Sequence, residues 1–210
     1  GAATRQEAET IGIAVGTPVT VDREFTTLAN NRVTGKAFDN RAGVAVLIKT
    51  LQQTDSPFTI YGVFTVQEEV GLKGARTSAY ALDPDVAIAT DVTIPGDHPG
   101  IDMKDAAVEM GRGPVITLVD SSGRGLIAHK SVVNWLKDVA EKQQIPVQLE
   151  VGSGGTTDAT AIHLTKGGIP STTISIPSRY IHSPVEVLDM KDIDAAVELL
   201  VAALKVKPKL

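Results

Sequence analysis

From Phe38 onward, short apolar runs alternate with amphipathic segments, and this alternation constrains the fold of the chain most strongly. Val86–Thr90 is a short, continuous apolar run, which is typical of a strand buried on both faces of a sheet. Ser131–Gln143 carries apolar residues at helical spacing and predicts an amphipathic helix. Strands that alternate with helices in this way predict an α/β fold with a mostly parallel sheet and helices on both faces.

The same patterns predict the other elements. Further helices are expected at Gln6–Gly12, Ala42–Leu51, Leu72–Ala81, Thr157–Leu164 and Met190–Leu204. Further strands are expected at Pro18–Arg23, Arg32–Ala37, Phe58–Val66, Val115–Val119, Val147–Val151 and Ser171–Ile176. Functional groups in parallel sheets lie beyond the carboxyl ends of the strands, so the polar residues that follow these strands are the candidates for a site.

Composition excludes several classes of protein. The chain has no cysteine, which rules out disulfides, iron–sulfur clusters and a thiol nucleophile. A formal net charge of −5 argues against a nucleic-acid partner, which would call for a basic surface. The longest apolar run, Ala195–Leu204, is interrupted by Glu198 and is too short to span a bilayer, and no signal peptide opens the sequence. These features predict a soluble, cytoplasmic protein without a membrane partner.

Side chains of the types that commonly bind metals follow the predicted strands or lie just before the first long helix. They are Asp39, Glu68, Glu69, Asp91 and His182. Carboxylates combined with imidazole suit Zn²⁺, Co²⁺ or Mn²⁺. A carboxylate can also bridge two such ions, and two-metal sites serve hydrolysis. The sequence therefore predicts a metal-dependent hydrolytic site at one edge of the sheet.

The adjacent pair Glu68 and Glu69 favours two different roles. Neighbours in an extended segment point to opposite sides, so one can bind a metal while the other acts as general base. Taken alone, the pair is also compatible with a solvated acidic turn. Asp91 could equally cap a helix, and His182 could be a buried, hydrogen-bonded histidine. A metal site is favoured because all of these groups fall at the same edge.

Five stretches carry a resemblance to a known family. They are GKAFDNRAG (Gly35–Gly43), TVQEEVGLKGA (Thr65–Ala75), ATDVTIPGD (Ala89–Asp97), GSGGTTDATAIH (Gly152–His163) and SIPSRYIHSPVEV (Ser175–Val187). The sequence resembles the dinuclear metallo-aminopeptidases that assemble as tetrahedral particles, dodecamers in that family. Its members include glutamyl and deblocking aminopeptidases, and some are labelled endoglucanases. The resemblance implies a phosphorylase/hydrolase-like zinc-peptidase core.

The resemblance also implies a role for each candidate residue. Asp39 would bridge two divalent ions, most simply Zn or Co, and Glu68 would be the general base. Glu69 and His182 would bind one ion, and Asp91 the other. The implied reaction removes N-terminal residues from peptides by a two-metal, bridging-water mechanism. The family often has Asp where this chain has Asn40, which is not a direct ligand, and a cis peptide is expected between Asp39 and Asn40.

The chain departs from the family at its beginning. Family members carry an earlier strand that ends in a histidine ligand of the Asp91-side ion, followed by an inserted β-rich assembly domain. No histidine precedes His98 in this sequence. We therefore expect a C-terminal portion of a longer enzyme, with residues 1–34 as the end of the insert and residues 35–210 as an incomplete catalytic core. The Asp91-side ion would then bind weakly or not at all, and this chain alone would be inactive.

The sequence is also compatible with other functions. The chain could be a non-catalytic fragment or scaffold; a glycoside hydrolase is less well supported, because 1 Trp, 3 Tyr and 4 Phe offer little aromatic surface for sugars. His98, His129 and His163 lack the strand-end context of a metal ligand. Asp158 could support the active-site loop or cap a helix. Arg179 could favour substrates with an acidic N-terminal residue or form an outward salt bridge.

Overall fold

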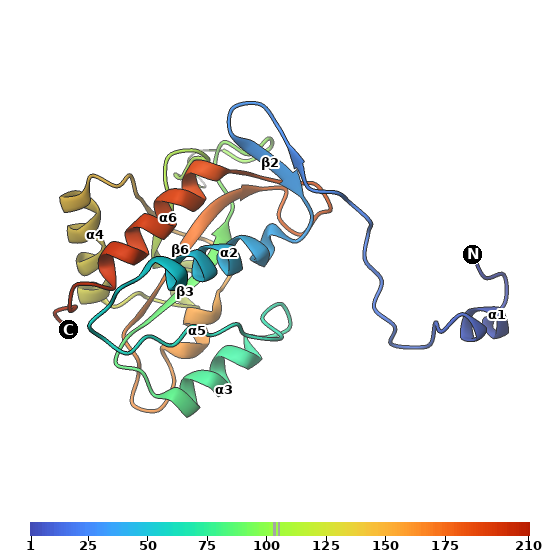
Figure 1. Cartoon of the computed structure of the whole chain (residues 1–210), viewed down its shortest axis with the longest axis horizontal. Coiled ribbons are helices and arrows are strands. Elements are labelled where there is room, and N and C mark those ends of the chain that lie inside the picture. Colours follow the sequence, from blue (N-terminus) through green and yellow to red (C-terminus); the bar gives the residue numbers. More distant parts are fainter. Residues whose placement is uncertain (103, 105) are drawn as a thin grey trace.

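A computed structural model describes residues 1–102, 104 and 106–210, and it places one mixed sheet between two layers of helices (Figure 1). The helices are α1 (Arg5–Thr10), α2 (Phe38–Gln53), α3 (Lys73–Leu82), α4 (Lys130–Gln143), α5 (Asp158–Ile162), α6 (Met190–Ala203) and a short 3-10 helix, η1 (Ser121–Gly123). The strands are β1 (Thr26–Thr27), β2 (Arg32–Gly35), β3 (Ala87–Thr93), β4 (Val115–Val119), β5 (Gln148–Val151), β6 (Ser171–Arg179) and β7 (Glu186–Asp189).

The strands form one sheet that is organised around the long strand β6. Its order is β1-β2-β7-β6-β4-β5, and β3 pairs with β6 off this path. Only β3–β6 and β4–β5 are parallel, while the other four pairings are antiparallel. The α/β class is thus confirmed, but the expectation of a mostly parallel sheet holds only in part. Apolar patterns predict where strands lie; they do not predict the direction in which neighbouring strands pair.

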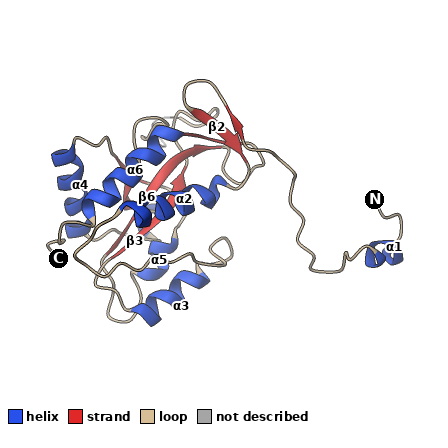
Figure 2. Ribbon diagram, in the orientation of Figure 1, coloured by secondary structure: helices blue, strands red, loops and turns tan. Residues whose placement is uncertain are grey.

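Helices cover both faces of the sheet, as predicted. Helices α2, α4 and α6 pack together on one side, and α3 and α5 contact each other on the opposite side (Figure 2). The main core lies under the first group and includes Val46 of α2, Leu136 of α4 and Leu199 of α6, each at most 1% exposed. These side chains fall at helical spacing on the inner faces of their helices, which is why the segments fold as helices against the sheet.

Two predicted strands are absent from the described structure. Phe58–Val66 and Pro18–Arg23 have extended or irregular backbone without strand pairing, and most of their side chains are exposed. A β-rich run becomes a strand only when a neighbouring strand satisfies its backbone hydrogen bonds. No described strand pairs with either segment. Conversely, the short strands β1 and β7 were not predicted.

Residues 1–25 form an arm that leaves the body of the molecule. Residues 1–31 contain no buried residue, and α1 lies at the far end of this arm (Figure 1). The arm joins the body where the ring of Phe25 packs edge-on against that of Phe38, with centroids 6.2 Å apart. No helix within the described ranges is long and apolar enough to cross a membrane.

Candidate metal centre

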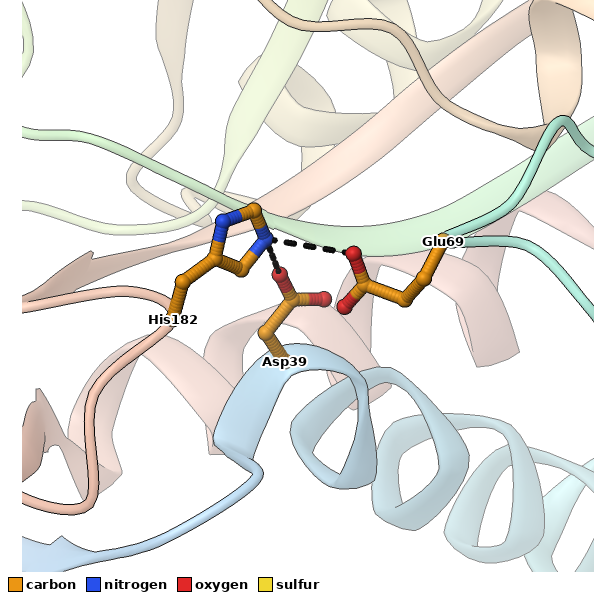
Figure 3. Close-up of side chains that lie close together, drawn as sticks. All are labelled: Asp39, Glu69 and His182. Atoms are coloured by element: carbon orange, nitrogen blue, oxygen red, sulfur yellow. Dashed lines mark ion pairs between the residues drawn. The ribbon is translucent and has the colours of Figure 1, made fainter. Parts of the chain in front are cut away.

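Three side chains from different parts of the sequence converge on one point. Figure 3 shows His182 pointing at the carboxylates of Asp39 and Glu69. Its Nε2 lies 3.0 Å from Asp39 Oδ2 and 3.3 Å from Glu69 Oε2. One ligand atom from each residue lies within 4.8 Å of the other two. Two carboxylates and an imidazole at this spacing form a donor set that a divalent cation such as Zn²⁺ would fit.

A buried carboxylate, Glu186 of β7, holds two of these three residues in place. Glu186 is 1% exposed, and its Oε2 accepts hydrogen bonds from the backbone N–H groups of Phe38 and Asp39. Its Oε1 accepts the backbone N–H of His182 at 3.1 Å. His182 has φ +64°, a left-handed conformation that is costly for a residue other than glycine and that this contact helps to fix. Glu186 thus ties the start of α2 to the β6–β7 turn.

The start of α2 is also attached to β3. The peptide between Asp39 and Asn40 is cis, as expected from the sequence. Asn40 Nδ2 donates to the carbonyl of Thr90 at 2.7 Å, and Asn40 Oδ1 accepts the N–H of Gly43 at 3.0 Å. A Cβ atom at Gly43 would clash with Thr90 O and Asn40 Oδ1. Glycine at this position therefore allows α2 to approach β3 next to Asp91.

The candidate ligands and the candidate base line one cavity of about 690 Å³. Its acidic lining residues are Asp39, Glu68, Glu69, Asp91, Asp120 and Glu150. No lysine or arginine lines the cavity among the residues that the structure describes, and His182 is the basic side chain present. An excess of negative charge in a partly buried space is unfavourable unless a cation compensates it.

The pKa values of these acids reflect this environment. Burial, together with repulsion from the nearby Asp39 and Glu68 carboxylates, raises the pKa of Asp91 to about 8. Burial followed by repulsion from Asp158 raises the pKa of Glu68 to about 7. Burial and repulsion from Glu69 raise the pKa of Asp39 to about 6. A bound divalent cation would stabilise the charged forms of all three side chains, so the acids present fit a metal centre.

Comparison with known proteins shows the family of the chain. The sequence profile of the M42 glutamyl aminopeptidase family matches residues 1–199. The chain belongs to that family. The predicted resemblance is therefore confirmed.

The relatives of this M42 chain are longer than the chain itself. This chain is 49% identical over 180 residues to a putative aminopeptidase of Acetivibrio thermocellus, and the match covers 84% of this chain and 52% of that protein. The solved aminopeptidase APDkam598 from Desulfurococcus kamchatkensis superposes with a TM-score of 0.96 at 50% identity, covering 99% of this chain and 58% of that one. The dodecameric PhTET1-12s structure superposes with a TM-score of 0.79 at 31% identity, covering 99% and 60%. The chain thus spans little more than half the length of these relatives.

Around the candidate metal centre of this M42 protein, Asp158 supports the segment that carries Glu68. Its Oδ2 accepts a hydrogen bond from Thr65 Oγ1 at 2.6 Å, which ties α5 to the approach to Glu68 and Glu69. Thr157, not Asp158, occupies the N-cap position of α5. The loop-supporting interpretation therefore describes Asp158 better than the capping interpretation.

The remaining candidate residues are not among the described residues that line the cavity. Arg179 Nη2 forms an ion pair with Asp97 Oδ2, and Arg179 is not among the described lining residues. His98 packs against the Tyr180 ring, His129 precedes α4 at the surface, and His163 Nδ1 lies 3.1 Å from the carbonyl oxygen of Ala159. None of these histidines belongs to the group formed by Asp39, Glu69 and His182.

Two further candidate functional residues, Glu186 and Glu150, were not predicted from the sequence. Glu150 lies inside a predicted strand, and Glu186 lies in β7, which was not predicted, so neither directly follows a predicted strand. The available signal was an isolated glutamate within an otherwise apolar stretch, as in the VEVL run that contains Glu186. Such a residue is rarely buried without partners, so it indicates a hydrogen-bonding role.

Proposed function

We propose that this chain carries the catalytic site of a metal-dependent aminopeptidase that removes N-terminal residues from peptides. The observation that carries the proposal is the convergence of Asp39, Glu69 and His182 at the cavity that Glu68 and Asp91 also line. Membership of the M42 family supports the class of reaction. The cavity has no Trp, Tyr or Phe among its described lining residues, which favours a peptidase over a glycoside hydrolase.

The ligand set supports two divalent ions per complete site, Zn²⁺ or Co²⁺. Asp39 would bridge them, because it lies against His182 and its charge also acts on Asp91. Glu69 and His182 would complete one site, and Asp91 would serve the other. When bound, such ions would supply Lewis-acid activation of water and of the peptide carbonyl.

Glu68 would act as the general base. Its carboxylate lines the cavity together with Asp39, Glu69 and Asp91, a position that allows it to accept a proton from a water molecule there and to return it. In this proposal, Glu68 takes a proton from the attacking water and then protonates the amine that leaves. Asp158 and Thr65 would keep the Glu68 segment in place during both steps.

The Asp91 side offers fewer ligands than the His182 side. Within the described ranges, no histidine besides His182 lines the cavity. We therefore propose that the 210-residue chain binds the Asp91-side ion weakly and is inactive alone, with activity in a longer polypeptide that contains it. The second candidate function, a non-catalytic fragment, rests on the same observation.

A metal titration tests these alternatives. The chain is stripped with chelator, reloaded with Zn²⁺ or Co²⁺, analysed for bound metal and assayed with aminoacyl-4-nitroanilides. We expect one tightly bound ion, lost in His182→Ala, with hydrolysis only by the longer polypeptide. Two tight ions with hydrolysis by the chain alone would overturn the weak-site proposal. Absence of hydrolysis by the metal-loaded longer polypeptide would favour the non-catalytic alternative.

Assembly is a separate proposal. The dodecameric state of PhTET1-12s supports a homo-oligomer for the complete protein. We propose that residues 1–34 end an inserted β-rich assembly domain and that residues 35–210 form the catalytic part. The exposed arm, whose exposed apolar side chains include Val15, Val19 and Phe25, supports a contact role for this segment.

The names of relatives leave the preferred N-terminal residue open. A lysyl aminopeptidase of Pyrococcus furiosus is 36% identical, and a glutamyl aminopeptidase of Lactococcus lactis is 35% identical. These two activities require opposite charges in the substrate pocket. The preference must therefore come from the cavity of this chain itself.

A further inference from the structure

The cavity extends beyond the metal centre into a space with mixed walls. Apolar side chains from the ends of β3 and from the loops around it line part of this space, and they include Val92, Ile94, Ile101 and Ile181. A carboxylate, Glu150, enters the lining from the opposite edge of the sheet, on β5. The space thus combines apolar surface with two acidic groups outside the candidate metal centre, Glu150 and Asp120.

Glu150 is held in position but is not neutralised. Its Oε1 accepts a hydrogen bond from Thr93 Oγ1 at 2.7 Å, which fixes the carboxylate at the end of β3. Among the described residues, no lysine, arginine or histidine forms an ion pair with it. A half-buried carboxylate with a fixed orientation and no cationic partner is unfavourable in the free protein, and a cationic ligand would relieve this cost.

The neighbouring acid, Asp120, has a different role. Its Oδ1 accepts the backbone N–H of Leu126, and its Oδ2 accepts the hydroxyl of Thr160 at 3.0 Å. Both oxygens are therefore used to join the loop after β4 to α5. Glu150 has no comparable structural contact beyond Thr93, so it is the acid available to a substrate.

We propose that Glu150 determines specificity by binding the positively charged side chain of a substrate's N-terminal lysine or arginine; this inference rests on the proposed aminopeptidase function. Lysine and arginine have a long apolar stem and a cationic end. The cavity offers apolar walls for the stem and the Glu150 carboxylate for the end. The opposite preference, for acidic residues, finds no support, because Arg179 pairs with Asp97 outside the described lining.

Paired substrates that differ only in charge give the sharpest test. Lysyl and norleucyl 4-nitroanilides have the same carbon chain, and only the lysyl substrate carries an ε-ammonium group. The assays use the longest natural polypeptide that contains this sequence, loaded with metal. Four forms are compared: the native protein, Glu150→Gln, Thr93→Val and Glu198→Gln. Glu198 is an exposed acid on α6, so its substitution removes one charge far from the cavity.

The expected result is selective. Glu150→Gln should lower kcat/KM for the lysyl substrate at least about tenfold, because a charge-assisted hydrogen bond is lost, and should leave the norleucyl substrate within about twofold. Glu198→Gln should change neither. Thr93→Val, which removes only the hydrogen bond that orients Glu150, should reduce the lysyl preference by a smaller factor. An equal loss on both substrates would overturn the proposal, since Glu150 would then bind the shared α-amine or stabilise the fold. No change on either substrate would also overturn it.

A binding measurement separates this inference from the proposed function. Calorimetry compares L-lysinamide with L-norleucinamide on the metal-loaded protein and on Glu150→Gln. Tighter lysinamide binding that depends on Glu150, without hydrolysis of any substrate, would leave cation recognition standing and reject the peptidase. Hydrolysis without any dependence of the lysyl preference on Glu150 would reject the inference alone. Absence of both would reject both.

Discussion

At the scale of single residues, the site depends on carboxylates held in an environment that disfavours their charge. Asp91 is 6% exposed, and the carboxylates of Asp39 and Glu68 act on it. Its pKa of about 8 in the folded protein exceeds the ordinary value of 3.8. The folded state therefore binds the proton of Asp91 more tightly than the unfolded state. The resulting stabilisation is complete below about pH 4 and is lost as the pH rises toward 8.

We expect the metal-free protein to lose stability between pH 5 and pH 8.5. Asp91→Asn removes the buried charge. At pH 8.5 without metal, the free energy of unfolding of this variant should be about 1–3 kcal/mol higher than that of the native protein. The difference should shrink at pH 5, where the native side chain is largely protonated. Urea unfolding at both pH values in the presence of chelator measures this. Equal pH dependence in the two proteins would contradict the prediction.

Glu186 positions Asp39 and His182 through their backbone N–H groups. Glu186→Gln keeps the shape of the side chain but cannot accept all three hydrogen bonds from Phe38, Asp39 and His182. We expect zinc affinity to fall about 10- to 100-fold, as is usual when a group that orients metal ligands is removed. Competition with a chromophoric chelator measures the affinity, with Glu198→Gln as control. Unchanged affinity in a folded variant would show that Glu186 only stabilises the fold.

The candidate ligands could be predicted because each follows or begins an element that the apolar pattern predicts, although the structure places Asp91 within β3 and forms no strand before Glu69. The structure brings Asp39, Glu69 and His182 together, and Glu68 and Asp91 line the same cavity. Their roles as ligands and base remain predictions. Glu186 and Glu150 could not be predicted, because their importance depends on partners that lie 147 positions or 57 positions away in the sequence.

At the scale of elements, α2 and β3 depend on close backbone approach. Gly43→Ala would place a Cβ atom against Thr90 O and Asn40 Oδ1, so α2 must shift away from β3. We expect a loss of about 1–3 kcal/mol in the free energy of unfolding, together with weaker metal binding. Urea unfolding measures the first effect.

Gly167→Ala is the matched control. Gly167 is exposed, and nothing lies within 4 Å of the position its Cβ would take. Its substitution should change stability by less than about 0.5 kcal/mol. Similar losses in both variants would show that close packing at Gly43 does not matter.

The elements themselves were predictable where local pattern and tertiary contacts agree. Val115–Val119 is predicted and observed with the same bounds, and α4 begins one residue earlier than predicted. Phe58–Val66 has an equally strong β pattern, yet it forms no strand because no described strand pairs with it. Local sequence supplies the tendency, but a strand also requires a neighbour.

At the scale of the whole molecule, the arm and the body differ in how they are stabilised. The body contains the apolar core, whereas residues 1–31 bury no side chain. Removal of residues 1–24 would keep the packing of Phe25 on Phe38 and should change the free energy of unfolding by less than about 0.5 kcal/mol. Light scattering on the same variant should show weaker self-association, because exposed apolar residues are lost. A large loss of stability would show that the arm contributes to folding.

The fold class was predictable at this scale, whereas the sheet topology was not. Alternating elements predicted helices on both faces, as observed. The antiparallel pairing of β4 with β6 and of β7 with its two neighbours depends on chain connections that apolar patterns do not encode.

Glu186 holds the candidate metal centre through the backbone, and this affects how the site can change. It fixes Asp39 and His182 through their main-chain N–H groups, so their positions do not depend on which side chains they carry. Ligand identity can then vary while the geometry of the loop ends is preserved. The candidate metal centre is thus open to redesign, for example by replacing His182 with cysteine to favour softer ions, without rebuilding the scaffold.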